Sequence, residues 1–325
     1  MSKPKVYVTR LIPQIGIDLL QAECHVEINP HDRPLTRQEL LENVQGCDGI
    51  LCLLTDKIDA EVFDAVQGVK GVANYAVGYD NIDVPEASKR SIPVSNTPGV
   101  LTDATAEMAW ALLFAVCRRV VESDAVIRSE QWSGWGPLQF IGGDVTSATL
   151  GIVGAGRIGT AMALKSKGFQ MKVLYNDAIR NEVLEQHLQA EKVDFDTLLE
   201  QSDYVSIHVP LMPETRHLFG KNAFERMKKT AYLINTSRGP VINEAELVDA
   251  LKSGEIAGAA LDVYEKEPLM AEGLKDLKNV VITPHTASAT TSSRGGMARL
   301  AATNLLLMLK GAKAPNCLNP EVYEK

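Results

Sequence analysis

The sequence of 325 residues lacks the features of a membrane protein, a secreted protein or a protein stabilised by a structural metal. It has no apolar run near the roughly 18 residues that would predict a membrane-spanning helix. Its first residues lack the apolar core and small-residue cleavage site of a signal peptide. The 5 cysteines are scattered, odd in number and without a Cys-x-x-Cys pair. We therefore expect reduced thiols in a cytoplasmic protein, with neither a disulfide framework nor a zinc site.

The sequence also has fewer positive than negative residues: 33 Lys and Arg against 41 Asp and Glu, which gives a net charge of -8. A chain this acidic has no general attraction to phosphate backbones or anionic lipids, so we expect no nucleic acid and no membrane partner. Gly-x-Ser-x-Gly, His-Glu-x-x-His and clustered metal ligands are missing as well, which disfavours hydrolases and metalloenzymes. The composition, 45% hydrophobic and 23% charged, is that of an ordinary globular protein.

Short β-rich runs alternate with amphipathic helical stretches in the first part of the chain, which is typical of a parallel α/β sheet. The expected strands are Lys5–Thr9, Gly49–Leu54, Gly71–Tyr75 and Ile92–Ser95, and the expected helices lie near Pro13–Ala22, Thr36–Asn43 and Asp59–Val66. Asn96-Thr97-Pro98-Gly99 interrupts this pattern. The apolar stretch Leu101–Val121 then predicts one long, largely buried helix that begins a second domain, and the aromatic and glycine-rich residues 131–137 predict a loop.

A similar strand pattern returns after residue 149. The expected strands are Leu150–Val153, Lys172–Tyr175, Tyr204–Val209, Ala231–Asn235, Gly258–Val263 and Val280–Thr283, and a last helix is expected at about Arg294–Lys310. At about 100–200 residues per domain, the length also favours two domains. The predicted fold class is therefore α/β, with two Rossmann-like or flavodoxin-like parallel-sheet domains and an active-site cleft between them.

An apolar strand leads directly into Gly154-x-Gly156-x-x-Gly159 and a helical stretch. The first glycine permits a tight turn, the second lets the backbone approach a pyrophosphate, and the third lets helix and strand pack closely. The helix N-terminus offers free N–H groups to the anion. Asp177, at the end of the next strand, would accept hydrogen bonds from a ribose 2′-hydroxyl and repel a 2′-phosphate. We predict a dinucleotide site that prefers NAD(H) over NADP(H), although Arg180 could weaken that preference.

Three further strand ends of the same predicted sheet carry an arginine (Arg238), acids (Glu265 and Glu267) and a histidine (His285). A guanidinium can hold a carboxylate and polarise an adjacent carbonyl. An imidazole can exchange a proton at neutral pH, and a neighbouring carboxylate keeps it protonated. Beside a nicotinamide, this trio predicts hydride transfer to a 2-keto acid. Each residue alone could be a surface turn, a loop charge or a helix cap, and Glu265 rivals Glu267. A further histidine, His208, is expected to be packed within a strand pattern.

With these motifs in hand, the sequence resembles the D-isomer-specific 2-hydroxyacid dehydrogenase family, and most closely its glyoxylate/hydroxypyruvate reductase branch. The motifs that carry the resemblance span nearly the whole chain: Asn74–Asp83, Asn96–Thr102, the glycine loop, His208–Leu211, Asn235–Gly239, Leu261–Tyr264 with Glu267-Pro268, and Thr283–His285. The family implies a coenzyme domain inserted within a catalytic domain. Residues 1–100 and 285–325 are then the substrate domain, and residues 101–284 are the NAD-binding Rossmann domain.

The resemblance also implies residue roles. It assigns Arg238, Glu267 and His285 as the catalytic set, and it places the substrate on Arg238, His285 and the backbone N–H groups of Val77 and Gly78. It assigns the cofactor to a larger set: Thr105, Gly154, Gly156, Arg157, Ile158, Gly159, Asp177, Val209, Pro210, Thr215, Thr236, Asp262 and Ala287. Family members are usually homodimers, so the loop Trp132–Phe140 is expected near the partner's active site. At position 287, where relatives usually have glycine, this sequence has alanine.

The leading hypothesis is NADH-dependent reduction of glyoxylate and hydroxypyruvate to glycolate and D-glycerate, with His285 as the proton donor. One alternative is a dehydrogenase for another 2-hydroxy acid, of a 3-phosphoglycerate-like or D-lactate-like kind. A second alternative is an NAD-sensing binding protein, because the family includes corepressors that keep the same trio. Such corepressors tend to carry long tails, and few residues follow Pro320 here, so we expect an enzyme.

Overall fold

The structure is a computed structural model that describes residues 3–324, and it divides into two compact units. Unit 1 contains the described residues up to Leu101 and those from Ala289 onward, while unit 2 is Thr102–Ser288. The sequence-based boundaries put Leu101 in the second domain and residues 285–288 in the first, whereas the structure groups them the other way. The roles given to the two domains, and the cleft expected between them, stay predictions.

Unit 1 is built on a parallel five-stranded sheet in the order β2-β1-β3-β4-β5. Its strands are β1 (Lys5–Val8), β2 (His25–Ile28), β3 (Gly49–Cys52), β4 (Val72–Asn74) and β5 (Val94–Ser95). Helices α1 (Gln14–Glu23) and α12 (Thr291–Leu309) pack together against one face, and α2 (Arg37–Asn43), α3 (Ala60–Val66) and α4 (Val84–Lys89) cover the other. Strand β2 and helix α4 were not predicted. β2 has no buried residue, so its sequence lacks the apolar pattern that marks the other strands.

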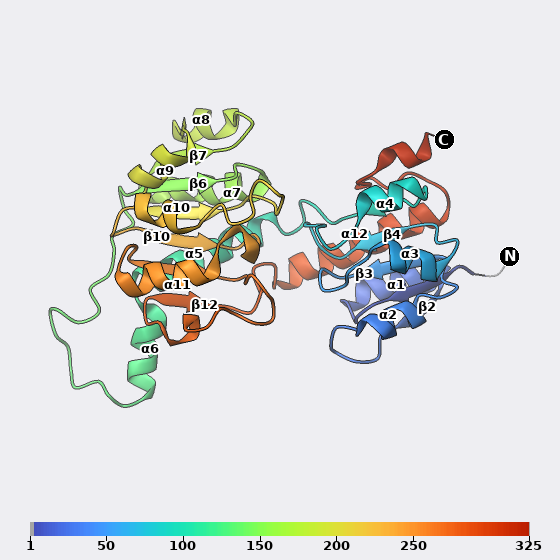
Figure 1. The fold of residues 1–325 in the computed structure, drawn as a ribbon, viewed down its shortest axis with the longest axis horizontal. Helices are drawn as coiled ribbons and strands as arrows, with labels where there is room; N and C mark the ends of the chain where they lie inside the picture. Colours follow the sequence, from blue (N-terminus) through green and yellow to red (C-terminus); the bar gives the residue numbers. More distant parts are fainter. Residues whose placement is uncertain (1–2, 325) are drawn as a thin grey trace. The chain divides into compact units, whose positions relative to one another are not determined.

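Unit 2 is built on a parallel seven-stranded sheet in the order β12-β11-β10-β9-β6-β7-β8 (Figure 1). Its strands are β6 (Thr149–Val153), β7 (Lys172–Asn176), β8 (Glu191–Lys192), β9 (Tyr204–Ile207), β10 (Tyr232–Asn235), β11 (Gly258–Leu261) and β12 (Val280–Ile282). Helices α5 (Thr102–Cys117), α7 (Arg157–Lys165) and α8 (Glu182–Leu188) cover one face, and α9 (Phe195–Gln201), α10 (Lys221–Arg226) and α11 (Glu244–Ser253) the other. The strand order reverses at β6, which pairs with β7 on one side and β9 on the other. In such sheets ligands bind outside the carboxyl ends of the strands at the point of reversal.

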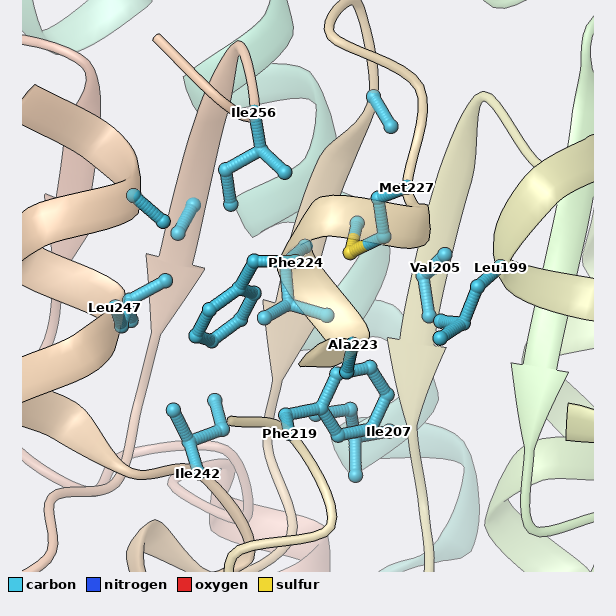
Figure 2. Packing of buried hydrophobic residues seen from close by; sticks show 14 of the residues in the cluster. Leu199, Val205, Ile207, Phe219, Ala223, Phe224, Met227, Ile242, Leu247 and Ile256 are labelled. Atoms are coloured by element: carbon cyan, nitrogen blue, oxygen red, sulfur yellow. The ribbon is translucent and has the colours of Figure 1, made fainter. Parts of the chain in front are cut away.

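The core of unit 2 holds the strand ends in place. On the α9–α11 face, Phe219, Phe224 and Ile256 pack among aliphatic side chains of β9 and of the surrounding helices (Figure 2). Each of these three side chains is at most 1% exposed. Burying one such side chain contributes about 1.5–3 kcal/mol relative to leaving it exposed. Because both faces of the sheet are covered, its central strands are continuously apolar, which is why the sequence predicts them. The exposed edge strand β8 was not predicted, because its two residues are charged.

The single long helix predicted over Leu101–Val121 is wrong, because the structure has two helices there. α5 ends at Cys117, and α6 begins at Val120 and ends at Arg128. Between them Arg119 adopts a left-handed conformation, with φ of 52°. No glycine or proline marks this break, so composition could not reveal it. None of the residues of α6 is buried, so the apolar side chains beyond Cys117 do not pack on the sheet.

Candidate functional site

The glycine loop lies at the reversal point of the seven-stranded sheet, next to the end of β9. Gly154 has φ of 94°, and a Cβ atom there would lie 2.8 Å from the backbone carbon of His208. A Cβ atom on Gly159 would lie 2.0 Å from the carbonyl oxygen of Gly154. On Gly156, by contrast, it would meet no heavy atom of the described residues within 4 Å. Packing of the chain itself therefore requires Gly154 and Gly159, while Gly156 leaves its backbone open to a ligand.

Asp177 follows β7, the strand beside β6, and its carboxylate is tied to the glycine loop. Oδ2 accepts a hydrogen bond from the Ala155 N–H at 2.7 Å, and Oδ1 accepts one from the Ile179 N–H at 3.0 Å. The carboxylate is therefore fixed beside the N-terminus of α7, which begins at Arg157. This position suits hydrogen bonds to a ribose that is joined to a pyrophosphate on the loop.

Polar groups on the neighbouring strand ends also fit a dinucleotide. The hydroxyl of Thr236, just beyond β10, is buried and has no hydrogen-bond partner within residues 3–324. An unpaired buried hydroxyl is costly unless a ligand completes it. Thr105 is also buried, on α5. The Thr215 hydroxyl instead donates to the Pro210 carbonyl at 2.6 Å and accepts from the Met212 N–H at 2.8 Å, so it shapes the loop after β9.

His208 begins that loop, and it is a packed histidine as expected. Its Nε2 lies 2.9 Å from the Ser206 hydroxyl. Burial lowers the pKa of His208 to about 3, so its ring is neutral at physiological pH. His208 therefore supports the glycine loop, on which its backbone packs, and is a poor candidate for a proton donor.

Arg238, Glu267 and His285 follow β10, β11 and β12, which are adjacent strands of the sheet. The Nδ1 atom of His285 lies 2.9 Å from Oε2 of Glu267 and 3.2 Å from Oε1. The Arg238 backbone is held by Asn235, whose side-chain amide donates to the Arg238 carbonyl at 3.0 Å. The structure thus brings the predicted acid and base into contact through Nδ1 of His285, and Nε2 is the ring nitrogen that Glu267 does not contact.

The electrostatics of this group favour an ionised Glu267. Burial of the carboxyl group raises its pKa, but the hydrogen bond and positive charge of His285 oppose that effect. The Tyr264 N–H and the charge of Arg238 act in the same direction as His285. The net result is a pKa below the ordinary value for a glutamate, so Glu267 stays charged at neutral pH, with its carboxylate beside Nδ1 of His285.

Glu265, the rival acid, contacts a different histidine. Its Oε1 lies 2.8 Å from Nε2 of His217, and its Oε2 accepts a hydrogen bond from the Glu244 N–H at 3.3 Å. Glu244 in turn is buried beneath this loop and accepts from the Glu265 N–H at 3.4 Å. Glu267, and not Glu265, is therefore the carboxylate beside His285.

Asp262 anchors the segment that presents His285. This aspartate is fully buried, and its carboxylate accepts hydrogen bonds from the Thr286 N–H at 2.8 Å, the Ala287 N–H at 2.7 Å and the Thr283 hydroxyl at 2.6 Å. His285 itself has φ of 54°, a left-handed conformation that is uncommon outside glycine. Asp262 offsets that strain by fixing the residues on both sides. These bonds also explain why residues 285–288 group with unit 2.

Ala287 is accommodated without backbone strain. Within residues 3–324 it is not one of the residues with positive φ, and its methyl group is buried. The sequence indicated Asp262 as an acid at a strand end, and the resemblance assigned it to the cofactor, but its anchoring role was missed. The available signal was an acid at the very end of an apolar strand, since such a residue needs donors to be buried.

In unit 1, asparagine side chains orient the loop that carries Val77 and Gly78. The Asn96 amide donates to the Val77 carbonyl at 2.7 Å, and the Asn74 amide donates to the Gly78 carbonyl at 2.9 Å. In a trans peptide the N–H points away from the carbonyl, so the Gly78 N–H faces away from Asn96. The residues alone did not indicate this pair of N–H groups, and only the resemblance pointed to it.

An apolar arm, residues 129–148, connects α6 to β6. Figure 1 shows the segment after α6 as a long loop that runs outside the sheet and helices of unit 2. Its large side chains are exposed, with Trp135 and Leu138 each 83% accessible and Trp132 and Ile141 more than half so. The arm includes the predicted loop 131–137, which is confirmed. Exposed apolar side chains gathered in one segment are typical of a surface that binds another protein.

Two other kinds of site are absent from the part of the chain that the structure describes. Over residues 3–324, no helix is both long and apolar enough to cross a membrane. The same residues contain no group of three or more His, Cys, Asp or Glu side chains placed to hold a metal ion.

Known proteins with similar sequences and structures cover the whole chain. Residues 110–287 match the family model described as D-isomer specific 2-hydroxyacid dehydrogenase, NAD binding domain. A glyoxylate reductase of Thermofilum pendens is 52% identical over 328 residues, covering 100% of this chain and 97% of the relative. The crystal structure of the TT0316 protein from Thermus thermophilus has a TM-score of 0.90 at 41% identity and covers 97% of this chain and 99% of that one.

A third relative is named as NADPH-dependent. The NADPH-dependent glyoxylate/hydroxypyruvate reductase of Sinorhizobium meliloti, solved in complex with NADP and malonate, has a TM-score of 0.86 at 29% identity. The match covers 98% of this chain and 98% of that one. Similar folds thus serve both nicotinamide coenzymes, so coenzyme choice must be argued from the residues beside the ribose.

Proposed function

The chain belongs to the D-isomer specific 2-hydroxyacid dehydrogenase family, and from that premise we propose that it reduces glyoxylate and hydroxypyruvate to glycolate and D-glycerate. The observation that carries the proposal is the contact between His285 and Glu267 at 2.9 Å. These residues follow β12 and β11, and Arg238 follows β10, which is the other neighbour of β11 in the sheet. The relative that is 52% identical is a glyoxylate reductase, which supports the choice of substrate.

In this proposal the residues divide the work as follows. NADH held by the glycine loop and Asp177 would supply the hydride that the carbonyl carbon of the keto acid receives. Arg238 pairs with the substrate carboxylate and polarises the neighbouring carbonyl, and the Val77 and Gly78 N–H groups also bind the carboxylate. His285 donates the proton on Nε2 to the carbonyl oxygen, which becomes the hydroxyl of the product. Glu267 holds Nδ1 and balances the charge of the protonated ring.

We also propose that NADH is preferred over NADPH. The Asp177 carboxylate is fixed beside the glycine loop by the Ala155 and Ile179 N–H groups. A ribose 2′-hydroxyl can donate to it, whereas a 2′-phosphate would be repelled by it.

A steady-state panel tests this function. The purified protein is mixed with NADH or NADPH and with glyoxylate, hydroxypyruvate, pyruvate or a phosphorylated keto acid, and coenzyme oxidation is followed by absorbance. We expect NADH oxidation to be fastest with glyoxylate and hydroxypyruvate. Discrimination by a pocket for one methylene is only about 10–200-fold, so relative kcat/KM values are needed. The substrate assignment is contradicted if a larger keto acid is preferred, and the enzyme assignment fails if NADH binds and no keto acid is reduced.

Replacing Glu267 with glutamine changes the pH dependence of the reaction. The lowered pKa of Glu267 keeps this carboxylate charged throughout the neutral range, and it lies 2.9 Å from Nδ1 of the proposed proton donor, His285. In Glu267→Gln the charge is lost, so the alkaline fall in kcat/KM for keto acid reduction should begin at lower pH than in the wild type. Glu265→Gln is the matched control, because Glu265 contacts His217 instead. An unshifted profile in Glu267→Gln would show that this carboxylate does not act on the proton donor.

The lowered pKa of Glu267 also determines how this residue contributes to folding stability at different pH values. A carboxylate with a lowered pKa in the folded protein stabilises it above the pKa of the unfolded chain. That contribution is lost as the pH falls through the lowered value in the folded state. The stability difference between wild type and Glu267→Gln should therefore be present at neutral pH and shrink in acid.

We propose that two copies of the chain associate through the apolar arm. Trp135→Glu with Leu138→Glu places charges on two of its most exposed apolar side chains and should produce monomers, as measured by light scattering after gel filtration. Leu11→Glu in unit 1 is the control, because Leu11 is also an exposed apolar residue. If the wild type is a monomer, or if the arm variant stays a dimer, the arm is not the dimer contact.

A further inference from the structure

We propose that Glu185 is a specificity-determining residue for the coenzyme, because it binds Arg180 and so withholds a guanidinium from the 2′-phosphate of NADP. The inference rests on the proposed function in one respect, since it requires a dinucleotide on the glycine loop. It extends that function by explaining how an arginine so close to Asp177 can be present in an enzyme that prefers NADH.

The ion pair between Arg180 and Glu185 is unusually well fixed for the protein surface. Both Nη2 and Nε of Arg180 contact Oε2 of Glu185, at 2.5 and 2.7 Å. The other carboxylate oxygen, Oε1, accepts a hydrogen bond from the buried Tyr175 hydroxyl at 2.7 Å. The side chain of Glu185 is 20% exposed and that of Arg180 is 71% exposed. Surface pairs usually contribute little because both partners move, but here Tyr175 fixes the acid and the acid positions the arginine.

The segment that carries this pair is attached to the glycine loop. The Asn181 amide donates to the Ala155 carbonyl at 2.8 Å and to the Thr160 hydroxyl at 2.7 Å. The Asn181 N–H donates to the Tyr175 hydroxyl at 3.0 Å. Ala155 in turn donates its N–H to Asp177. Arg180 therefore lies in the sequence between Asp177 and Asn181, whose side chains both bind the backbone of Ala155. These two contacts fix the backbone of Arg180 beside the proposed ribose site.

Two carboxylates then oppose a 2′-phosphate by different means. Asp177 repels it directly, while Glu185 occupies the arginine that could bind it. Arginine pairs with phosphate through two parallel hydrogen bonds, and such charge-assisted pairs are among the strongest polar contacts in proteins. Removing the charge of Asp177 alone ends the repulsion and supplies no new ligand. Releasing Arg180 alone supplies the ligand and keeps the repulsion. The two changes should therefore reinforce each other.

The test is a double-mutant cycle read by equilibrium binding. Adenosine 2′,5′-bisphosphate and adenosine 5′-monophosphate are titrated into wild type, Asp177→Asn, Glu185→Gln and the double variant, by calorimetry at fixed salt. We expect the double variant to gain about tenfold more affinity for the bisphosphate than the product of the two single effects. Affinity for the monophosphate should change by no more than about twofold in Glu185→Gln, which shows that the loop remains folded. It should fall in the two variants without the Asp177 carboxylate, because that carboxylate is proposed to bind the ribose hydroxyl.

Arg180→Ala in the double variant should remove the gain, because the arginine is the new ligand. In the wild type the same substitution should change neither affinity. Asp124→Asn is the matched control, since it breaks the exposed pair with Arg128 on α6, far along the chain from this loop. The proposal is overturned if the single effects simply multiply, if the gain survives Arg180→Ala, or if Asp124→Asn produces the same gain.

The outcome is separable from that of the proposed function. If the wild type binds adenosine 5′-monophosphate and NADH but reduces no keto acid, the enzyme assignment fails and the cycle still decides the role of Glu185. If the wild type binds neither nucleotide, the dinucleotide site and this inference both fail.

Discussion

Replacing His285 with alanine should lower kcat for glyoxylate reduction by roughly 10²–10⁴-fold while NADH binding is retained. The reason is that His285 is the group that we propose gives the substrate oxygen its proton. Its Nδ1 is held by Glu267 at 2.9 Å, which leaves Nε2 for the substrate. The dinucleotide residues assigned on the glycine loop and Asp177 are untouched by this change. Steady-state rates together with NADH fluorescence titration separate the two effects.

Two control variants separate the loss of proton donation from the structural effects of the His285→Ala substitution. His217 also pairs with a glutamate, Glu265, at 2.8 Å in the same unit, so His217→Ala removes a comparable pair without a predicted catalytic role. Because His285 has φ of 54°, His285→Asn is included, since asparagine tolerates the left-handed conformation better than alanine. Both His285 variants should lose activity and His217→Ala should keep it. Equal losses at positions 285 and 217, or no loss at 285, would remove His285 from the proton role.

Replacing Gly156 with alanine should raise the Kd for NADH by roughly 10–100-fold without lowering the melting temperature of the protein. A Cβ atom at this position meets no heavy atom of residues 3–324 within 4 Å, so the fold itself tolerates the methyl group. The backbone there is proposed to lie against the pyrophosphate, where the same methyl group would displace the ligand. Weaker NADH binding without a loss of stability would thus indicate that the space beside Gly156 is occupied by the bound coenzyme.

Substitutions of two other glycines serve as controls for this prediction. Gly159→Ala should lower both stability and NADH binding, because its Cβ atom would lie 2.0 Å from the Gly154 carbonyl oxygen. Gly168→Ala should change neither, since this glycine also has open space around it but lies after α7, away from the N-terminus of that helix. If Gly156→Ala binds NADH as tightly as the wild type, the pyrophosphate does not approach the backbone at that residue.

The sequence predicts the features of this protein that depend on short spacings. The Gly154–Gly159 spacing predicts a turn with three distinct glycine roles, and the lack of room for a Cβ atom at Gly154 and Gly159 agrees with two of them. The position of Asp177 after the next strand follows from the same βαβ pattern. The gathering of Arg238 and His285 also follows, because parallel strands deliver their carboxyl ends to one edge of a sheet.

Contacts made through loops could not be predicted from the residues. Glu265 and Glu267 are two positions apart, and only the course of the loop decides which one meets His285. The anchoring of residues 283–287 by Asp262 joins segments far apart in the chain. An acid at the end of an apolar strand signals a need for donors, but the local sequence does not show which segment supplies them. The break after Cys117 depends on a left-handed Arg119, and arginine carries no propensity for that conformation.

The most direct test of the central claim is to follow the hydride itself. The protein is incubated with glyoxylate and NADH that carries deuterium on the transferable position of the nicotinamide, and the product is examined by mass spectrometry. Hydride transfer with a proton from His285 predicts glycolate that contains one deuterium on carbon and none on its exchangeable hydroxyl in ordinary water. Glycolate without carbon-bound deuterium, or no glycolate from a protein that binds NADH, would contradict the account.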